Sequence, residues 1–172
     1  MSKLGVTSKQ SRKFKSNEMF LRANNEWGRG KVRSAFRLFR VAARAGDKGA
    51  QVNVGYFYDK GIGVRRDQSA ALYWYKRAYR RGDASAATNI GTIWRDKHKP
   101  QRALSWFFRA VKLGDDGSNL EIAKHYLRND RDPGKAIRYL KKVFSSDRVA
   151  EIEAQEAKQL LKEVKKELGT SK

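Results

Sequence analysis

A repeated dipeptide constrains this chain more than any other feature. Gly-Asp begins at Gly46, Gly82 and Gly114, so successive copies stand 36 and 32 residues apart. When the copies are aligned, small and apolar residues recur at the same offsets on both sides of each glycine. Periods of this length are typical of repeat proteins, in which each unit packs mainly against its neighbours.

The residues after each Gly-Asp share one helical face. In the first copy these positions are Ala50, Val54, Gly55 and Tyr58, and the later copies carry residues of similar size at the same offsets. Steps of three and four residues place side chains on one side of a helix. The pattern therefore predicts a helix after each Gly-Asp.

The residues before each Gly-Asp predict a second helix. The second copy carries Ala71, Trp74, Tyr75 and Ala78, again in steps of three and four. Alanine lets helix backbones approach closely, and the aromatic rings fill the space beside them. One helix pair cannot bury both of its faces, so several pairs must stack. We expect the glycine to take a left-handed conformation and the aspartate to cap the next helix.

The coarse secondary structure is therefore four helix pairs and one further helix. The paired helices are expected at residues 17–27, 32–45, 48–60, 68–81, 84–96, 101–113, 117–129 and 134–145. Residues 148–168 carry apolar residues at helical spacing and predict a ninth helix that covers the end of the stack. A docking or dimerising helix is the alternative for this segment.

The unit that runs from Ala50 to Ala78 resembles the Sel-one-like repeat, a relative of the tetratricopeptide repeat. The matching residues are Ala50, Val54, Gly55, Tyr58, Gly61, Gly63, Val64, Asp67, Ala71, Trp74 and Ala78. The resemblance covers roughly residues 30–145. It departs at residues 96–100 and 130–134, where other sequences replace the Gly-x-Gly-Val loop.

This resemblance implies an all-α chain wound as a right-handed α/α superhelix and used to bind other proteins. With the composition of the two ends, it predicts three regions. These are a disordered basic arm at 1–15, a repeat solenoid at 16–146, and a capping helix with its tail at 147–172.

The charge of the chain is strongly positive and uneven. Lysine and arginine number 39 against 18 aspartates and glutamates, which gives a net charge of +21. Residues 1–45 alone carry +10, whereas residues 148–172 carry +1. Such a surface attracts acidic proteins, nucleic acids or anionic membranes.

Basic residues recur on the second helix of successive pairs. They predict a ridge that binds an anionic partner, because carboxylates would solvate such a face equally well but are nearly missing from it. The alternative is a solvated face with no partner. The residues of this predicted ridge are Arg33, Arg37, Arg40, Arg44, Lys76, Arg77, Arg80, Arg109 and Lys112.

A second candidate surface lies on the first helix of each pair, opposite its core face. It mixes apolar and polar residues, as a peptide groove does, although contacts with neighbouring helices explain it equally well. The residues of this predicted groove are Val52, Tyr56, Thr88, Thr92, Arg95 and Lys124.

The sequence argues against several classes of function. The chain has no cysteine, and His98 and His125 are too few for an ordinary histidine metal motif, so we expect no metal and no cofactor. No serine-based catalytic motif or phosphate-binding loop with its usual context occurs. Because no apolar run is long enough to span a bilayer, we expect a cytoplasmic protein with no membrane span and no small-molecule substrate.

Two functional hypotheses remain. The favoured one is a non-enzymatic interaction scaffold whose basic surface docks an acidic protein partner. The alternative is a nucleic-acid-associated accessory protein that binds phosphates through the basic arm and the ridge.

Overall fold

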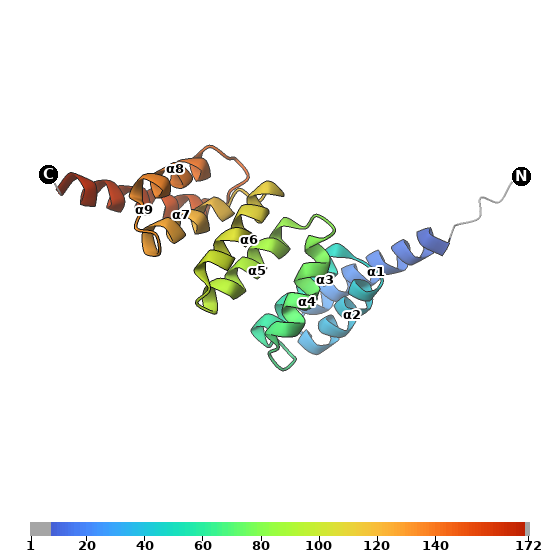
Figure 1. The fold of residues 1–172 in the computed structure, drawn as a ribbon. Helices are drawn as coiled ribbons and strands as arrows, with labels where there is room; N and C mark the ends of the chain where they lie inside the picture. Colours follow the sequence, from blue (N-terminus) through green and yellow to red (C-terminus); the bar gives the residue numbers. More distant parts are fainter. Residues whose placement is uncertain (1–7, 171–172) are drawn as a thin grey trace, which may run out of the picture. The chain divides into compact units, whose positions relative to one another are not determined.

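The computed structural model describes residues 8–170, with the side chains of 13–169, and this part of the chain is helical with no strand. Figure 1 shows the helices in chain order. They are α1 (Ser8–Gly28), α2 (Val32–Arg44), α3 (Lys48–Lys60), α4 (Gln68–Tyr79), α5 (Ala84–Asp96), α6 (Pro100–Lys112), α7 (Ser118–Arg128), α8 (Pro133–Phe144) and α9 (Glu151–Thr170). The predicted all-α chain of helix pairs is confirmed.

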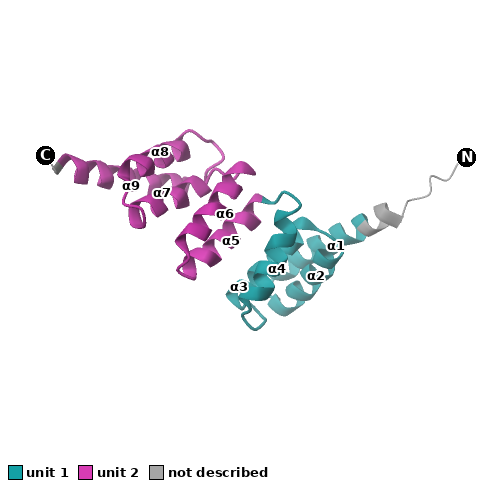
Figure 2. Cartoon of the chain, viewed as in Figure 1, with its two compact units in different colours: residues 1–83 teal, residues 84–172 magenta. Residues whose placement is uncertain are grey.

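The helices form two compact units, residues 1–83 and 84–172 (Figure 2). In the first unit α1 packs with α2, α3 packs with α4, and α2 also contacts α3. In the second unit α5 packs with α6 and α7 with α8, while α6 contacts α7 and α9 packs on α8. Each unit thus contains two of the predicted helix pairs.

Each Gly-Asp turn ends a helix as the sequence predicts. Gly46, Gly82 and Gly114 have φ angles of 101°, 79° and 95°, in the left-handed region where glycine carries no steric penalty. The N–H of the following aspartate donates in each copy to the carbonyl of an alanine five residues earlier, at 3.0 to 3.2 Å. This bond satisfies a carbonyl that the helix end leaves free.

The aspartates of these turns do not all cap the next helix in the same way. The Asp47 carboxylate accepts the backbone N–H of Ala50 at 2.7 Å, as a helix N-cap does. Asp115 differs, because α7 begins only at Ser118. Its carboxylate instead accepts hydroxyl hydrogen bonds from Thr88 and Ser118, which ties α5 to the turn before α7. The predicted capping role of Asp115 is therefore wrong.

A glycine–aromatic contact sets the spacing within one helix pair of each unit. A Cβ added to Gly55 on α3 would lie 2.6 Å from a ring carbon of Tyr75 on α4. A Cβ added to Gly91 on α5 would lie 2.6 Å from a ring carbon of Phe107 on α6. Both rings are buried, so the two helices meet at a distance that only glycine allows.

The first unit has a core rich in aromatic rings. Trp27 of α1 lies 4.5 Å from Phe57 and 5.7 Å from Phe39, measured between ring centroids. The Ser16 hydroxyl donates to the Ala42 carbonyl at 3.3 Å and is buried. These contacts hold α1 against α2 and α3.

The start of α1 corrects the prediction of a disordered arm at residues 1–15. The helix begins at Ser8, so residues 8–15 are helical, and residues 1–7 lie outside the described part of the chain. Residues 8–15 contain no glycine or proline and are rich in lysine, arginine and glutamine, which are good helix formers. The anchored helix can therefore continue toward the N-terminus.

In the second unit α9 covers apolar residues of α7 and α8. Ala157 of α9 is buried in one cluster with Leu120, Ala123, Leu140 and Val143. Leu160 and Leu161 of α9 pack against the same cluster. This helix also begins later than predicted, at Glu151.

The glycine–aromatic contact yields a test of stability. We expect Gly55→Ala and Gly91→Ala each to lower the free energy of unfolding by about 1–2 kcal/mol, because overpacking outweighs the better helix propensity of alanine. Urea denaturation followed by circular dichroism measures this change. Gly169→Ala is the control, because that glycine is also helical but has no neighbour within 4 Å of an added Cβ. Unchanged or increased stability in Gly55→Ala and Gly91→Ala contradicts the close-packing account.

Candidate functional site: basic surfaces and a polar pocket

The predicted ridge residues lie on α2 and α4 of the first unit and on α6 of the second, except Arg80, which directly follows α4. Arg40 and Arg77 are half-buried, and the other seven are exposed. We call the seven residues of the first unit the basic face: Arg33, Arg37, Arg40, Arg44, Lys76, Arg77 and Arg80.

Aromatic rings hold three of the ridge guanidinium groups. The Arg40 guanidinium lies 5.9 Å from the centroid of Phe36, and that of Arg109 lies 4.4 Å from Trp106. Arg77 lies 5.3 Å from the Trp74 ring and donates a hydrogen bond to the Tyr73 hydroxyl at 3.0 Å. These cation–π contacts are made along each side chain's own helix and limit its freedom.

No carboxylate among the side chains of residues 13–169 forms an ion pair with any of the nine ridge residues. Ion pairs do form elsewhere, for example between Arg148 and Asp116 at 2.6 Å. Three of the ridge guanidinium groups therefore lie against rings, and seven of the nine ridge side chains are exposed to solvent. That arrangement can attract and bind an anionic surface.

The predicted groove residues are not one free surface. In the first unit Tyr56 stacks on Trp27 with the ring centroids 6.1 Å apart, and Val52 is half-buried on the same helix. In the second unit Thr88 is hydrogen bonded to Asp115 and Thr92 is half-buried. Contacts with neighbouring helices thus account for Tyr56 and Thr88.

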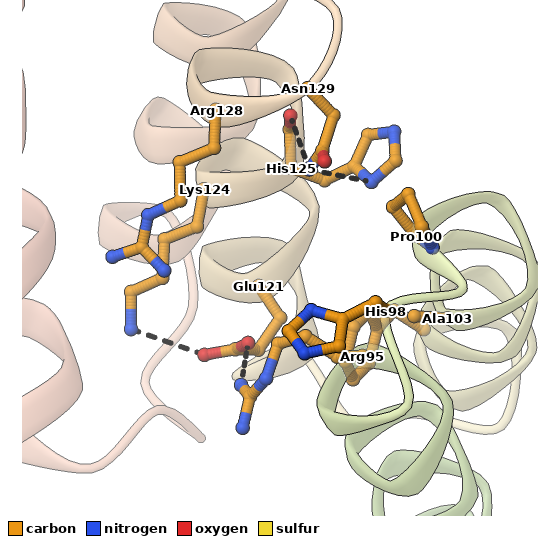
Figure 3. Close-up of a pocket in the computed structure, with 10 residues that line it drawn as sticks. Arg95, His98, Pro100, Ala103, Glu121, Lys124, His125, Arg128 and Asn129 are labelled. Atoms are coloured by element: carbon orange, nitrogen blue, oxygen red, sulfur yellow. Dashed lines mark hydrogen bonds and ion pairs between the residues drawn. The ribbon is translucent and has the colours of Figure 1, made fainter.

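Arg95 and Lys124 meet in a pocket of the second unit with a volume of about 340 Å³ (Figure 3). Both reach the carboxylate of Glu121, Arg95 at 2.5 Å and Lys124 at 3.1 Å. Lys124 also lies 2.8 Å from Glu156 on α9. The two cations that the sequence assigns to a groove therefore already have carboxylate partners.

The electrostatic balance at Arg95 follows from these partners. Burial lowers the pKa of the guanidinium, but the charge and hydrogen bond of Glu121, with a smaller contribution from Asp96, raise the pKa above its ordinary value. Arg95 stays charged, and Glu121 neutralises part of the pocket.

Other residues of the pocket were not predicted from the sequence. Pro100, Ala103 and Phe107 of α6 form an apolar wall, and Arg128 is exposed at the other side. His125 is 6% exposed, and its Nε2 lies 3.3 Å from Asp130 Oδ1 without the alignment of a hydrogen bond. The helix-face pattern singled out Arg95 and Lys124 alone, because helical periodicity does not show which residues of α6 and of the turn before it lie against α7.

The residues that line this pocket include no serine, threonine or cysteine. Within the part of the chain that the structure describes, no cluster of three or more histidines and carboxylates is placed to hold a metal ion. No helix in that part is both long and apolar enough to cross a bilayer.

The repeat pattern matches a known family. The model of the Sel1 repeat matches residues 29–47, 49–83, 91–115 and 130–142. This chain belongs to the Sel1 repeat family. Proteins built from Sel1 repeats generally serve as scaffolds for protein interactions and typically have no catalytic function.

Two curated relatives share part of the sequence. A Sel1-like repeat-containing protein of Acanthamoeba polyphaga mimivirus is 29% identical over 91 residues, which are 53% of this chain and 17% of that protein. The component HRD3A of the ERAD-associated E3 ubiquitin-protein ligase of Arabidopsis thaliana is 31% identical over 67 residues, which are 38% of this chain and 10% of that protein. The chain thus spans less than a fifth of either relative.

Two solved structures share the fold. The Sel1 repeat protein from Oxalobacter formigenes is 25% identical with a TM-score of 0.65, covering 80% of this chain and 58% of that one. The protective antigen c5321 of uropathogenic Escherichia coli, which displays a Sel1-like repeat fold, is 18% identical with a TM-score of 0.69. That match covers 93% of this chain and 40% of that one.

One turn of the Sel1 repeat chain bears a strained residue at the pocket rim. His98 has a φ of 53° two residues after the end of α5, and Gly61, directly after α3, has a φ of 70°. The Lys99 N–H donates to the Trp94 carbonyl at 2.9 Å, as in other left-handed helix ends. A residue with a Cβ is disfavoured in this conformation.

We expect His98→Gly to raise the free energy of unfolding by about 1 kcal/mol, because glycine removes the penalty of the left-handed backbone. Thermal or urea denaturation measures the change. His98→Ala is the matched control, since it removes the imidazole but keeps the Cβ, and it should bring no gain. Equal stabilisation by both substitutions would show that the imidazole and not the backbone carries the cost.

Proposed function

We propose that this Sel1 repeat chain is a non-enzymatic scaffold that docks an acidic protein partner on its basic face. The observation that carries the proposal is the state of the ridge cations. They are exposed or held against aromatic rings, and no carboxylate among the described side chains pairs with them. Their charge is therefore available to a second molecule.

The physical benefit of this arrangement is a binding surface that needs little reordering. Arg40 and Arg77 are positioned by Phe36 and Trp74, so part of their side-chain entropy is already lost before a partner arrives. The unbalanced positive charge speeds encounter with an acidic surface and disfavours basic partners.

Two observations favour an acidic protein over nucleic acid as the partner of these cations. The family generally mediates protein interactions. Phe36 and Trp74 are buried beneath the arginines, and the exposed ring of Tyr73 is occupied by the Arg77 guanidinium, so the basic face offers little free ring surface for stacking bases. We further propose a cytoplasmic location, because a chain without cysteine has no need of an oxidising compartment.

The test uses charge reversal on the basic face. We expect the combined variant Arg33→Glu, Arg37→Glu, Lys76→Glu and Arg80→Glu to bind its partner at least about tenfold more weakly, because rim charges govern encounter and salt dependence. These four side chains are exposed and make no cation–π contact among those described, so the fold should persist. Calorimetry with a partner purified from the native host measures the affinity.

The control reverses two exposed lysines of α9, Lys158→Glu and Lys162→Glu, which should leave the affinity unchanged. Raising the salt concentration should weaken wild-type binding and have little effect on the reversed variant. A partner that binds the reversed variant as tightly as wild type contradicts the proposal. Recovery of nucleic acid alone, lost on nuclease treatment, would favour the nucleic-acid hypothesis instead.

A further inference from the structure

A cavity of about 580 Å³ lies in the first unit beside the loop that joins α3 to α4. Arg40 of α2 and both Arg65 and Arg66 of the loop line it, together with the rings of Phe36 and Tyr58. Of these three arginines only Arg40 belongs to the repeating columns of the sequence. The other two stand in the loop that carries the Gly-x-Gly-Val pattern.

The structure fixes two of the three guanidinium groups. Arg66 donates through Nε to the Asp59 carbonyl at 2.8 Å, which leaves its two terminal nitrogens free to bind. Arg40 is positioned against the Phe36 ring. Arg65 is exposed, and among the described side chains no carboxylate pairs with any of the three.

The carboxylate of Asp67 also lines this cavity, but it serves as a helix N-cap. Asp67 caps α4, and its Oδ1 accepts the backbone N–H groups of Ser69 and Ala70, both at 2.9 Å. It lies beyond ion-pair distance from the three arginines. The contrast with the pocket of the second unit is informative, because there Glu121 neutralises Arg95 and Lys124. In the cavity of the first unit the carboxylate of Asp67 forms no described ion pair with the arginines.

We propose that this cavity binds a phosphate monoester, carried on a phosphorylated side chain of the acidic partner. A single carboxylate offers two oxygens and one charge, which cannot satisfy three guanidinium groups. A phosphate monoester carries about −1.5 to −2 charges and three acceptor oxygens, and arginine binds it through paired hydrogen bonds. The aromatic floor contacts the apolar part of the same side chain.

A single phosphorylated side chain fits this place better than a polynucleotide. The rings that line the cavity are not available for base stacking. Phe36 is 6% exposed, and its ring packs edge-to-face against that of Tyr58 with a centroid distance of 5.4 Å. This inference rests on the proposed function for its occupant, but the binding chemistry can be tested without the partner.

The experiment is an NMR titration of the full chain with O-phosphoserine and with inorganic phosphate, against acetate at equal ionic strength. We expect both phosphates to bind about tenfold more tightly than acetate and to shift the resonances of Tyr58 and Gln68. The variant Arg65→Gln with Arg66→Gln should weaken phosphate binding about tenfold. Arg65→Gln alone, which breaks no described contact, should show a smaller loss and guards against misfolding of the double variant.

The matched control is Arg33→Gln with Arg37→Gln, which removes two charges from the basic face outside the cavity. Equal weakening by this control, or equal binding of acetate and phosphate, would overturn the phosphate site. Tighter binding of a short single-stranded RNA than of a phosphoserine peptide, lost in the same Arg65 and Arg66 variant, would overturn the proposed occupant. Failure here with continued partner binding to the basic face would refute the cavity and leave the proposed function standing.

Discussion

The close contact between a glycine on one helix and an aromatic ring on the next is the constraint on which the rest of this structure depends. It occurs between Gly55 and Tyr75 and again between Gly91 and Phe107, with the same spacing of an added Cβ from the ring. Because the ring is buried against glycine, the outward side of α4 and α6 is left to long cationic side chains. Core packing thus decides which residues can meet a partner.

Helix α4 has both a buried aromatic residue and exposed cationic residues. Tyr75 is fully buried, and burial raises the pKa of its hydroxyl, as do the charge of Asp59 and a weaker effect of Tyr56. Its hydroxyl has no hydrogen-bond partner among the described atoms, and phenylalanine stands at the equivalent position in Phe39 and Phe107. The repeat therefore requires the aromatic ring at this position and not the hydroxyl group. Lys76 of the same helix and Arg80 directly after it are exposed to solvent.

Much of the fold could be predicted from the sequence because the repeat encodes it locally. The helices after Gly46 and Gly82 begin and end where the spacing of small and apolar residues predicts, and the glycine turns have the expected left-handed φ. Two local features could not be predicted from the repeat. The extension of α1 to Ser8 depends on helix propensity outside the repeat, and the role of Asp115 depends on the distant Thr88 hydroxyl.

The candidate sites were less predictable than the fold. A column of residues in an alignment shows that Arg77 faces away from the core, but it cannot show that Arg95 and Lys124 converge on Glu121 from two helices. Arg65 and Arg66 belong to a loop, where helical periodicity gives no information, and only the folded chain places them beside Arg40. Side chains that meet through tertiary contacts are therefore the part that sequence patterns miss.

The most direct test of the central packing claim is a nuclear Overhauser measurement on the folded chain. The account predicts strong cross-peaks from the Hα protons of Gly55 to the Tyr75 ring and from those of Gly91 to the Phe107 ring, with both glycines shifted by the ring currents. Absence of these cross-peaks in either helix pair, while the chain remains folded, would contradict the account.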